Sequence, residues 1–531
     1  MASQAYEGIL TSPLLALAVG CLLILYIVYS YASSWYRLRE FDGPPLASLS
    51  YLWMFRTSLA GEQAVRYRAV SDRYGALARI GPNDLLTADP DVLRRMSAAR
   101  SLYPRSNWYR AMRIDPYVPV VVSMTDDAAH DRRKAQLTPG YSGRENPDIE
   151  ASIDEQIASL AVLIRRKYVS SSSSSTSTSK SKSTNTTVHD GAESPPPLLR
   201  PMDLAITTNY FTLDVITRIA YGREFGYLET DSDVFDYIKT TESITPRNTL
   251  LAEIPYLSLF AFSNTALKLF GPKPTDKEGI GQMMALAQKI VGERFGPDAK
   301  NERDMLGSFI RHGLPRRQCE AEVLVQIIAG SDTTATAIRG TMLYIMSTPH
   351  VYFRLQREID DAVASGKAST VIYEGLRMNL PFSGLLMKEV PPEGDTLGGR
   401  FVPGGTRVAQ SILAIQRSRE IFGDDADLFR PERWLIDRGH HHVDGEEGEE
   451  EKGGEERKRE MAQTVDLVFG CGRWGCIGKT VAFLELNKIY FELLRHFDFQ
   501  LIDVKNPMRS RNYNMFFQSD MWVKVTERTG L

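Results

Sequence analysis

Residues 469–478 read Phe-Gly-Cys-Gly-Arg-Trp-Gly-Cys-Ile-Gly, and the amphipathic stretch KTVAFLELNKIYFELLRHF follows them. Cys476 stands just before the expected start of this helix, where free backbone N–H groups and the helix dipole favour a thiolate. The glycines before Cys476 let the loop turn tightly and approach a flat macrocycle. The stretch therefore predicts a sulfur ligand for iron, with Phe469 shielding the sulfur from water. A zinc site built on Cys471 and Cys476 is the alternative, but no second cysteine pair completes it.

The overall composition is that of a large globular chain. It has 531 residues, of which 43% are hydrophobic and 24% charged, and its formal net charge is −3. Such a balance supplies a large core and gives no indication of nucleic-acid binding. The four cysteines, Cys21, Cys319, Cys471 and Cys476, are too sparse and irregular for a disulfide framework, which suits a reducing compartment.

The N-terminal region contains a long uncharged segment. Residues 13–29 read PLLALAVGCLLILYIVY, and extension to residue 32 gives about twenty residues, enough to cross a bilayer. A cleaved signal peptide is the alternative, but residues 1–11 contain Glu7 and no Lys or Arg. Arg37 and Arg39 follow the span, which predicts a lumenal N-terminus. We expect a lumenal segment at 1–12, a transmembrane anchor at 13–32, a basic, Pro-containing hinge at 33–45 and one catalytic domain at 46–531.

Hydrophobic periodicity predicts a mostly α protein with a small β part. Short strands are expected within residues 76–86, and helices over 153–166, 204–221, 279–295, 320–346 and 481–497. Two stretches look inserted: a Ser-rich segment at 169–197, predicted to be disordered, and an acidic segment at 438–462. The latter begins near three adjacent histidines, 440–442, for which solvation is a simpler interpretation than metal binding.

Further motifs lie upstream of the cysteine loop. Residues 329–334 read Ala-Gly-Ser-Asp-Thr-Thr inside an apolar helix, where Asp332 and Thr333 compete for backbone hydrogen bonds and Gly330 leaves room for a small ligand. Glu374 and Arg377 stand three residues apart, a spacing that by itself indicates only a helix-surface ion pair. Arg433 lies within Phe-Arg-Pro-Glu-Arg-Trp at 429–434.

These motifs, in this order, resemble those of the cytochrome P-450 family from residue 37 to residue 528. The resemblance implies the cytochrome P-450 fold, with haem held between the helix of residues 320–346 and the cysteine-loop helix. Cys476 is then the axial iron ligand, Asp332 and Thr333 form the acid–alcohol pair that supplies protons, and Glu374, Arg377 and Arg433 form a buried brace for the cysteine loop.

The resemblance leaves open which side chains contact the haem propionates. His130 and Lys134, in the run His-Asp-Arg-Arg-Lys at 130–134, match a helix that binds propionates in the family, although surface charge also explains the run. The family's usual arginine two residues before the cysteine is absent: Trp474 takes that place and Arg473 stands one residue earlier. Phe469, Arg473 and Trp474 are thus further candidate cofactor contacts, and which side chain meets a propionate stays open.

The resemblance implies an oxidoreductase, a monooxygenase that uses haem and O2. The sequence has no dinucleotide motif, so electrons from NADPH are expected through a partner flavoprotein, NADPH-cytochrome P-450 reductase. Arg132, Arg133, Arg473 and Lys479 are candidates for a basic docking face. We expect a single-pass protein of the endoplasmic reticulum membrane with a cytosolic catalytic domain.

The substrate is expected to be a small apolar molecule of fungal secondary metabolism, because the loop resembles that of pisatin-demethylase-like and benzoate-hydroxylase-like fungal members. Two alternatives stay open: a haem-thiolate isomerase or dehydratase, and a damaged haem-binding relative. The second is suggested by the segment 355–374, which is shorter than is usual in the family. Residues 250–270 are apolar and are either a second membrane contact or an ordinary core segment.

Overall fold

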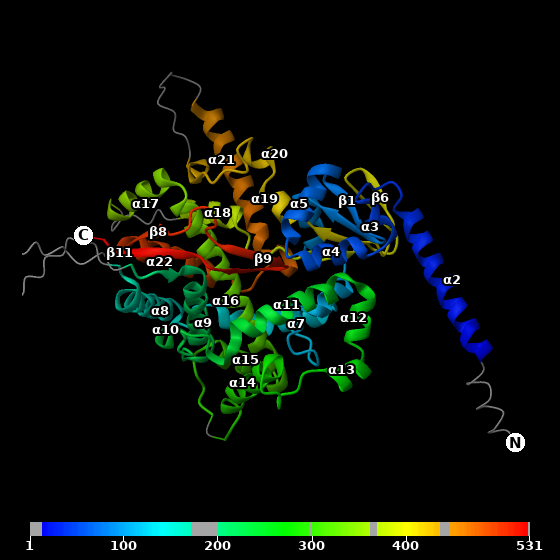
Figure 1. The fold of residues 1–531 in the computed structure, drawn as a ribbon, viewed down its shortest axis with the longest axis horizontal. Coiled ribbons are helices and arrows are strands. Elements are labelled where there is room, and N and C mark those ends of the chain that lie inside the picture. The colour runs from blue at the N-terminus through cyan, green and yellow to red at the C-terminus, as the bar shows by residue number, and fades with distance from the viewer. Residues whose placement is uncertain (1–12, 171–198, 298, 362–368, 436–446, 529–531) are drawn as a thin grey trace, which may run out of the picture.

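The computed structural model describes residues 13–170, 199–297, 299–361, 369–435 and 447–528 (Figure 1). The α-helices are α2 (Pro13–Arg37), α3 (Pro45–Leu49), α4 (Leu52–Ala60), α5 (Gln63–Tyr74), α6 (Pro90–Ser97), α7 (Asp127–Leu137), α8 (Ile149–Leu163), α9 (Leu204–Tyr221), α10 (Tyr227–Thr230), α11 (Tyr237–Glu253), α12 (Pro255–Ala261), α13 (Asn264–Phe270), α14 (Gly279–Glu293), α15 (Met305–Arg311), α16 (Arg316–Met346), α17 (Pro349–Asp361), α18 (Ser369–Met378), α19 (Ile412–Gln416), α20 (Arg419–Phe422), α21 (Glu447–Val465) and α22 (Lys479–His496). Short helical turns are η1 (Asn107–Met112), η2 (Thr138–Tyr141), η3 (Ile164–Tyr168), η4 (Val234–Asp236), η5 (Pro431–Trp434), η6 (Asp466–Phe469) and η7 (Gly472–Trp474). The prediction of a mostly α protein with a small β part is confirmed.

The strands form small sheets. Their bounds are β1 (Leu77–Gly81), β2 (Asp84–Thr87), β3 (Met202–Asp203), β4 (Lys388–Glu389), β5 (Asp395–Leu397), β6 (Arg400–Val402), β7 (Arg407–Gln410), β8 (Phe497–Leu501), β9 (Arg509–Tyr513), β10 (Met515–Ser519) and β11 (Trp522–Glu527). The largest described sheet has the order β1-β2-β7-β4, with β2 and β7 parallel and the other pairs antiparallel. Its edge strand β4 pairs Lys388 with Val408 of β7. This pairing fixes the position of Lys388, which lines the central cavity.

Helix α16 is the axis of the body, and it crosses the centre of the molecule in Figure 1. It is 31 residues long and buried along most of its length, as its apolar flanks predict. Neighbouring helices approach it closely at glycines. A Cβ added at Gly375 of α18 would lie 2.0 Å from Oγ1 of Thr341, and one at Gly340 would lie 2.0 Å from Nδ2 of Asn379. A Cβ at Gly330 would meet Ile216 of α9 at 2.7 Å, so the gap predicted there is largely filled by a neighbouring helix.

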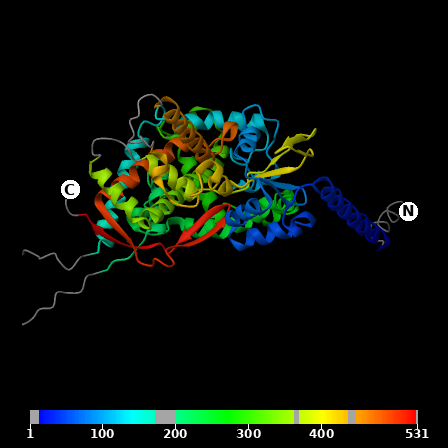
Figure 2. The ribbon, with the colours of Figure 1, turned by 90° about the horizontal axis from the view of Figure 1, so that it is seen from above.

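Helix α2 projects from the body in both ribbon views (Figures 1 and 2). Its C-terminal end is nevertheless tied down by Arg79 of β1, which donates to the carbonyl oxygens of Ser34, Trp35 and Leu38 at 3.2, 3.3 and 3.4 Å. A cation over the last carbonyls of a helix satisfies groups that the helix itself leaves free. Leu38 and Phe41 are buried in the core beside it. The segment predicted as a hinge therefore packs against the body.

In the part of the chain that the structure describes, no helix combines the length and the apolar character needed to cross a membrane.

Two predicted segments fall partly or wholly outside the described residues. The Ser-rich insert from residue 171 onward and the histidines at 440–442 lie outside the described residues. The later part of the acidic insert lies in a helix, because α21 begins at Glu447. Glu, Lys and Arg, which are frequent in this segment, are good helix formers.

We predict that Gly375→Ala destabilises the protein, because the new methyl group must displace Thr341 in a packed contact between α18 and α16. Overpacking of this kind costs about 1–3 kcal/mol. The measurement is the thermal unfolding midpoint of the haem-loaded protein. The matched control is Gly292→Ala, also within a helix, whose Cβ would meet only the mobile end of Arg316. Equal midpoints for the two variants would contradict the packing argument.

Candidate active site

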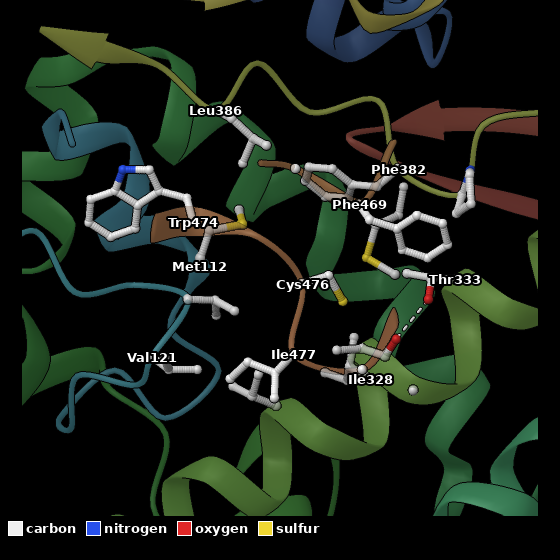
Figure 3. A pocket seen from close by; sticks show the side chains of 18 of the residues that line it. Met112, Val121, Ile328, Thr333, Phe382, Leu386, Phe469, Trp474, Cys476 and Ile477 are labelled. Carbon is white, nitrogen blue, oxygen red and sulfur yellow. Dashed lines mark hydrogen bonds between the residues drawn. The ribbon is translucent and has the colours of Figure 1, made fainter. Parts of the chain in front are cut away.

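A cavity of about 430 Å³ lies between α16 and the loop that precedes α22. Its walls are mainly apolar, and Cys476 is on one side while Ala329 and Thr333 of α16 also line it. Figure 3 shows the Cys476 sulfur pointing into this space, with Ile328 and Thr333 across from it. The sequence analysis placed Cys476 and Thr333 at the same site, and the structure brings them together.

The cysteine loop has the geometry that its glycines allow. Gly470 and Gly472 have φ of +69° and +58°, in the left-handed region, and a Cβ at Gly472 would lie 2.1 Å from the carbonyl oxygen of Ser97. The backbone N–H of Cys476 donates to the Phe469 carbonyl at 2.7 Å, which closes the loop. Phe469 also lines the cavity and packs against Phe483 of α22 at 5.4 Å between ring centroids. The loop thus presents its sulfur from a rigid turn.

The environment of the sulfur differs from the expectation in one respect. Burial raises the pKa of the Cys476 thiol, although the N–H groups of Gly478 and Lys479 and the charge of Lys134 act in the opposite direction. The N–H groups at the helix start act to lower the pKa of the thiol, as predicted, but burial outweighs them and the net shift of the pKa is upward. A metal cation at the sulfur would supply the missing positive charge.

Several cationic side chains line one edge of the cavity. Lys134 of α7 donates to the carbonyl oxygens of Arg473 and Gly475, at 2.7 and 2.8 Å, and so braces the cysteine loop itself. Arg105 and Lys388 are neighbours through an isolated backbone bridge. The Arg105 guanidinium lies 3.9 Å and the Lys388 ammonium 5.3 Å from the centre of the Trp474 ring. Among the described residues, none of these three cations forms an ion pair with a carboxylate.

The energetics of this edge indicate that negative charge is missing. Burial, followed by the charge of Arg105, lowers the pKa of Lys388 to about 7 and that of His130 to about 4. Nε of Arg105 is buried without a hydrogen-bond partner in the part of the chain that the structure describes. Uncompensated buried cations are costly. Two carboxylates of a flat macrocycle at this edge would neutralise these cations, so the residues fit haem, and Arg105, His130 and Lys388 would hold its propionates.

Of the two candidate side chains before Cys476, only one lines the cavity. Arg473 does not line the cavity; its guanidinium pairs with Asp127 and lies 3.3 Å from Asp131. Trp474 does line the cavity, and its ring is tilted by 49° to the His130 ring at 4.3 Å between ring centroids. Arg105 and Lys388 were missed by the sequence analysis, because neither belongs to a local motif and only the pairing of distant segments brings them to the site.

Asp332 and Thr333 are consecutive residues of α16, and of the two only Thr333 lines the cavity. The Thr333 hydroxyl faces the cavity and donates to the Ala329 carbonyl at 2.8 Å, the bond drawn in Figure 3. Asp332 is buried outside the cavity lining, and its Oδ2 accepts a hydrogen bond from Tyr237 at 3.2 Å. Burial raises the pKa of Asp332 to about 6, although the charge of Arg339 and the Tyr237 hydrogen bond lower it. The pKa of Asp332 is thus close to neutral pH, and Asp332 adjoins Thr333, whose hydroxyl faces the cavity.

Glu374, Arg377 and Arg433 form a fully buried cluster. Glu374 accepts from Arg377 at 2.7 and 2.9 Å, from Arg433 at 3.0 Å and from the indole N–H of Trp434 at 3.0 Å. Burial alone would raise the pKa of Glu374, but the hydrogen bonds and charges of the two arginines hold it below the ordinary value. The short connection before Glu374 does not prevent this cluster from forming.

The predicted basic docking face is only partly available. Arg133 is buried and pairs with Glu322 of α16 at 2.6 Å, so it is a structural residue, which corrects the expectation. Lys479 pairs with Asp466 at 2.8 Å, and Arg473 is paired as described above. Arg132 is exposed. Charged side chains that are buried are usually paired with an opposite charge in this way. The sequence alone does not reveal which residue is the partner.

Comparison with known proteins gives a consistent result. The family model described as cytochrome P450 matches residues 182–520. The cytochrome P450 monooxygenase ABA1 of Pyricularia oryzae is 46% identical over 524 residues, covering 95% of each chain. The cytochrome P450 monooxygenase aba1 of Botryotinia fuckeliana is 41% identical, covering 93% of this chain and 92% of its own. The cytochrome P450 monooxygenase abl1 of Leptosphaeria maculans is 34% identical, covering 92% and 83%.

We predict that Cys476→Ala abolishes the red-shifted carbon monoxide band that thiolate ligation gives in the reduced protein, because Cys476 presents the sulfur to the cavity. The control is Cys471→Ser, on the same loop, whose sulfur lies 3.9 Å from the Leu93 carbonyl and is expected to be dispensable for the band. The measurement is the reduced carbon monoxide difference spectrum. Loss of the band in Cys471→Ser with retention in Cys476→Ala would reverse the assignment.

Proposed function

Since the chain belongs to the cytochrome P450 family and is a haem-dependent monooxygenase, we propose that it oxidises a small, largely apolar organic molecule as a tailoring step in fungal secondary metabolism. The proposed reaction is RH + O2 + 2 e− + 2 H+ → ROH + H2O, or a related epoxidation, dealkylation or multistep oxidation. When bound, haem supplies the activation of O2, with Cys476 as its thiolate ligand.

The observation that carries this proposal is the placement of the Thr333 hydroxyl of α16 in the same cavity as Cys476, with Asp332 next to it in the helix. An apolar pocket in which Thr333 is a polar group near the reacting space favours insertion of oxygen over acid–base chemistry on the substrate. A non-oxygenase reaction has no use for this pair. The intact Asp332–Thr333 arrangement therefore favours the oxygenase.

The proposed role of Thr333 is to hold a proton donor at its Oγ1. Its own proton is bonded to the Ala329 carbonyl, which leaves its lone pairs free to order water in the cavity. Asp332, behind it on the same helix turn, is proposed to resupply protons from the side of α16 that faces Tyr237. Electrons are proposed to come from NADPH-cytochrome P-450 reductase.

We predict that Thr333→Ala keeps haem and substrate binding but diverts electrons from NADPH into peroxide. Loss of a positioned proton-transfer group typically costs 10²–10⁴-fold in rate, so product per NADPH is expected to fall while NADPH consumption continues. The measurement uses a reconstituted reductase and a substrate that gives a spin-state shift. The control is Thr245→Ala on α11, since the Thr245 hydroxyl also lines the cavity and donates to the carbonyl four residues earlier. Unchanged coupling in Thr333→Ala would reject the role.

We also propose attachment to the endoplasmic reticulum membrane through α2, with the catalytic domain in the cytosol. What supports it is exposed apolar surface. Leu22 and Leu25 of α2 are 66% and 63% exposed, and Phe260 and Phe270 of α12 and α13 are 68% and 80% exposed. In Figure 1, α12 and α13 lie on the side of the body from which α2 projects. An apolar surface of this extent favours a lipid contact over water, and it supports this proposal over the alternative of a core segment for α12 and α13.

We predict that deletion of residues 1–32 releases part of the protein from membranes and keeps haem binding. The cut leaves Ser34, Trp35 and Leu38 in place, so Arg79 keeps its acceptors. Adding Leu257→Glu and Phe260→Glu to the truncated protein is expected to release the remainder, because these exposed side chains are on α12. Fractionation of both forms is the measurement. Complete solubility of the simple truncation would remove the case for a second lipid contact.

A further inference from the structure

The helix that forms one wall of the cavity also touches the acid of α16. Thr241, Ile244, Thr245, Asn248 and Thr249 of α11 line the cavity. Tyr237, the first residue of α11, lies one turn before Thr241 and is buried. Its hydroxyl oxygen is 3.0 Å from Oγ of Ser331 and 3.2 Å from Oδ2 of Asp332. No sequence motif marks Tyr237, and neither the proposed reaction nor the buried brace uses it.

The donors and acceptors of this cluster allow the Tyr237 hydroxyl two alternative hydrogen-bond arrangements. Ser331 donates its hydroxyl proton to the Ile327 carbonyl at 2.7 Å, so toward Tyr237 it acts as an acceptor. Tyr237 has one proton to give. When Asp332 is charged, Tyr237 donates to the carboxylate; when Asp332 is protonated, the acid donates to Tyr237 and Tyr237 donates to Ser331. Both arrangements leave every proton of the cluster bonded, which a phenylalanine would not.

The other charges around Asp332 do not replace this contact. Arg339 of α16 is buried and donates to Asn209 at 2.6 Å and to Gln518 at 2.5 Å, so its hydrogen bonds are spent elsewhere. Glu242 of α11 and Asp233 before η4 add negative charge that disfavours the carboxylate, and Tyr227 of α10 is also near. Among the side-chain hydrogen bonds of the described residues, Tyr237 is the partner of Asp332. The charged form of this acid is therefore favoured by the charge of Arg339 and by one side-chain hydrogen bond, from Tyr237.

We propose that Tyr237 is a positioning residue that holds the Asp332 carboxyl and sets the pH at which this acid becomes charged. The relevance to turnover rests on the proton supply proposed above for Asp332 and Thr333. Tyr237 belongs to α11, the helix whose residues 241–249 line the cavity, so the cavity wall and the hydrogen-bond partner of the acid are on one helix.

The test is infrared difference spectroscopy of the full-length haem protein labelled with [4-13C]aspartate, titrated between about pH 4.5 and 8. The Asp332→Asn variant assigns the carboxyl band of Asp332. Tyr237→Phe removes a hydrogen bond that favours the charged form, so the midpoint of this band is expected to move upward by about one pH unit. The matched control is Tyr227→Phe, a buried tyrosine near Asp332 that makes no hydrogen bond to it among the described residues. Its midpoint is expected to equal that of the wild type.

The outcomes separate this inference from the proposed function. An unmoved midpoint in Tyr237→Phe, or an equal shift in Tyr227→Phe, overturns the positioning role. The carbon monoxide spectrum and the thermal midpoint verify that each variant is folded. The pH profile of peroxide released per NADPH is the second readout. If it moves with the infrared midpoint, both proposals gain support; if the infrared midpoint moves and the profile does not, Tyr237 positions Asp332 but Asp332 does not supply the protons.

Discussion

The structure depends on one buried carboxylate, that of Glu374, which has no contact with solvent. Glu374 accepts from two guanidinium groups, an indole and the backbone N–H of Arg430, so α18, η5 and the segment between α19 and η5 cannot separate without leaving charge unpaired. Aromatic rings carry this constraint to the cysteine loop. Trp434 packs on Tyr373, Tyr373 on Phe483, and Phe483 on Phe469, which lines the cavity beside the sulfur.

The distal half of the site depends on a different kind of contact, close packing against α16. Gly330, Gly340 and Gly375 let Ile216, Asn379 and Thr341 occupy the space where a side chain would stand. With its neighbours this close, α16 holds Thr333 toward the cavity and Asp332 away from it. The cavity therefore lies against the face of α16 that carries Thr333. The Asp332 carboxyl and the charged groups near it lie outside the cavity.

The sequence predicted the parts of this arrangement that are local. The period of residues 204–221 identified α9 to the residue, and the glycines of the cysteine loop predicted a tight turn. It missed what long-range pairing creates. Arg105 and Lys388 meet through a bridge between segments far apart in the chain, and Tyr237 reaches Asp332 from another helix. Arg133 looked like a surface charge because its partner Glu322 lies in a different motif. The free thiol was expected to be acidic because desolvation is invisible in a linear pattern.

Trp474 has a consequence for how such a loop can change over evolutionary time. Its ring stands where related loops carry an arginine, and it is surrounded by Arg105, Lys388 and His130. An arginine at this position would add a further cation to a desolvated cluster in which, among the described residues, neither Arg105 nor Lys388 forms an ion pair with a carboxylate. An arginine in place of Trp474 is therefore expected to be tolerated better where position 105 or 388 carries no cation. The residues at these three positions are expected to change together rather than one at a time.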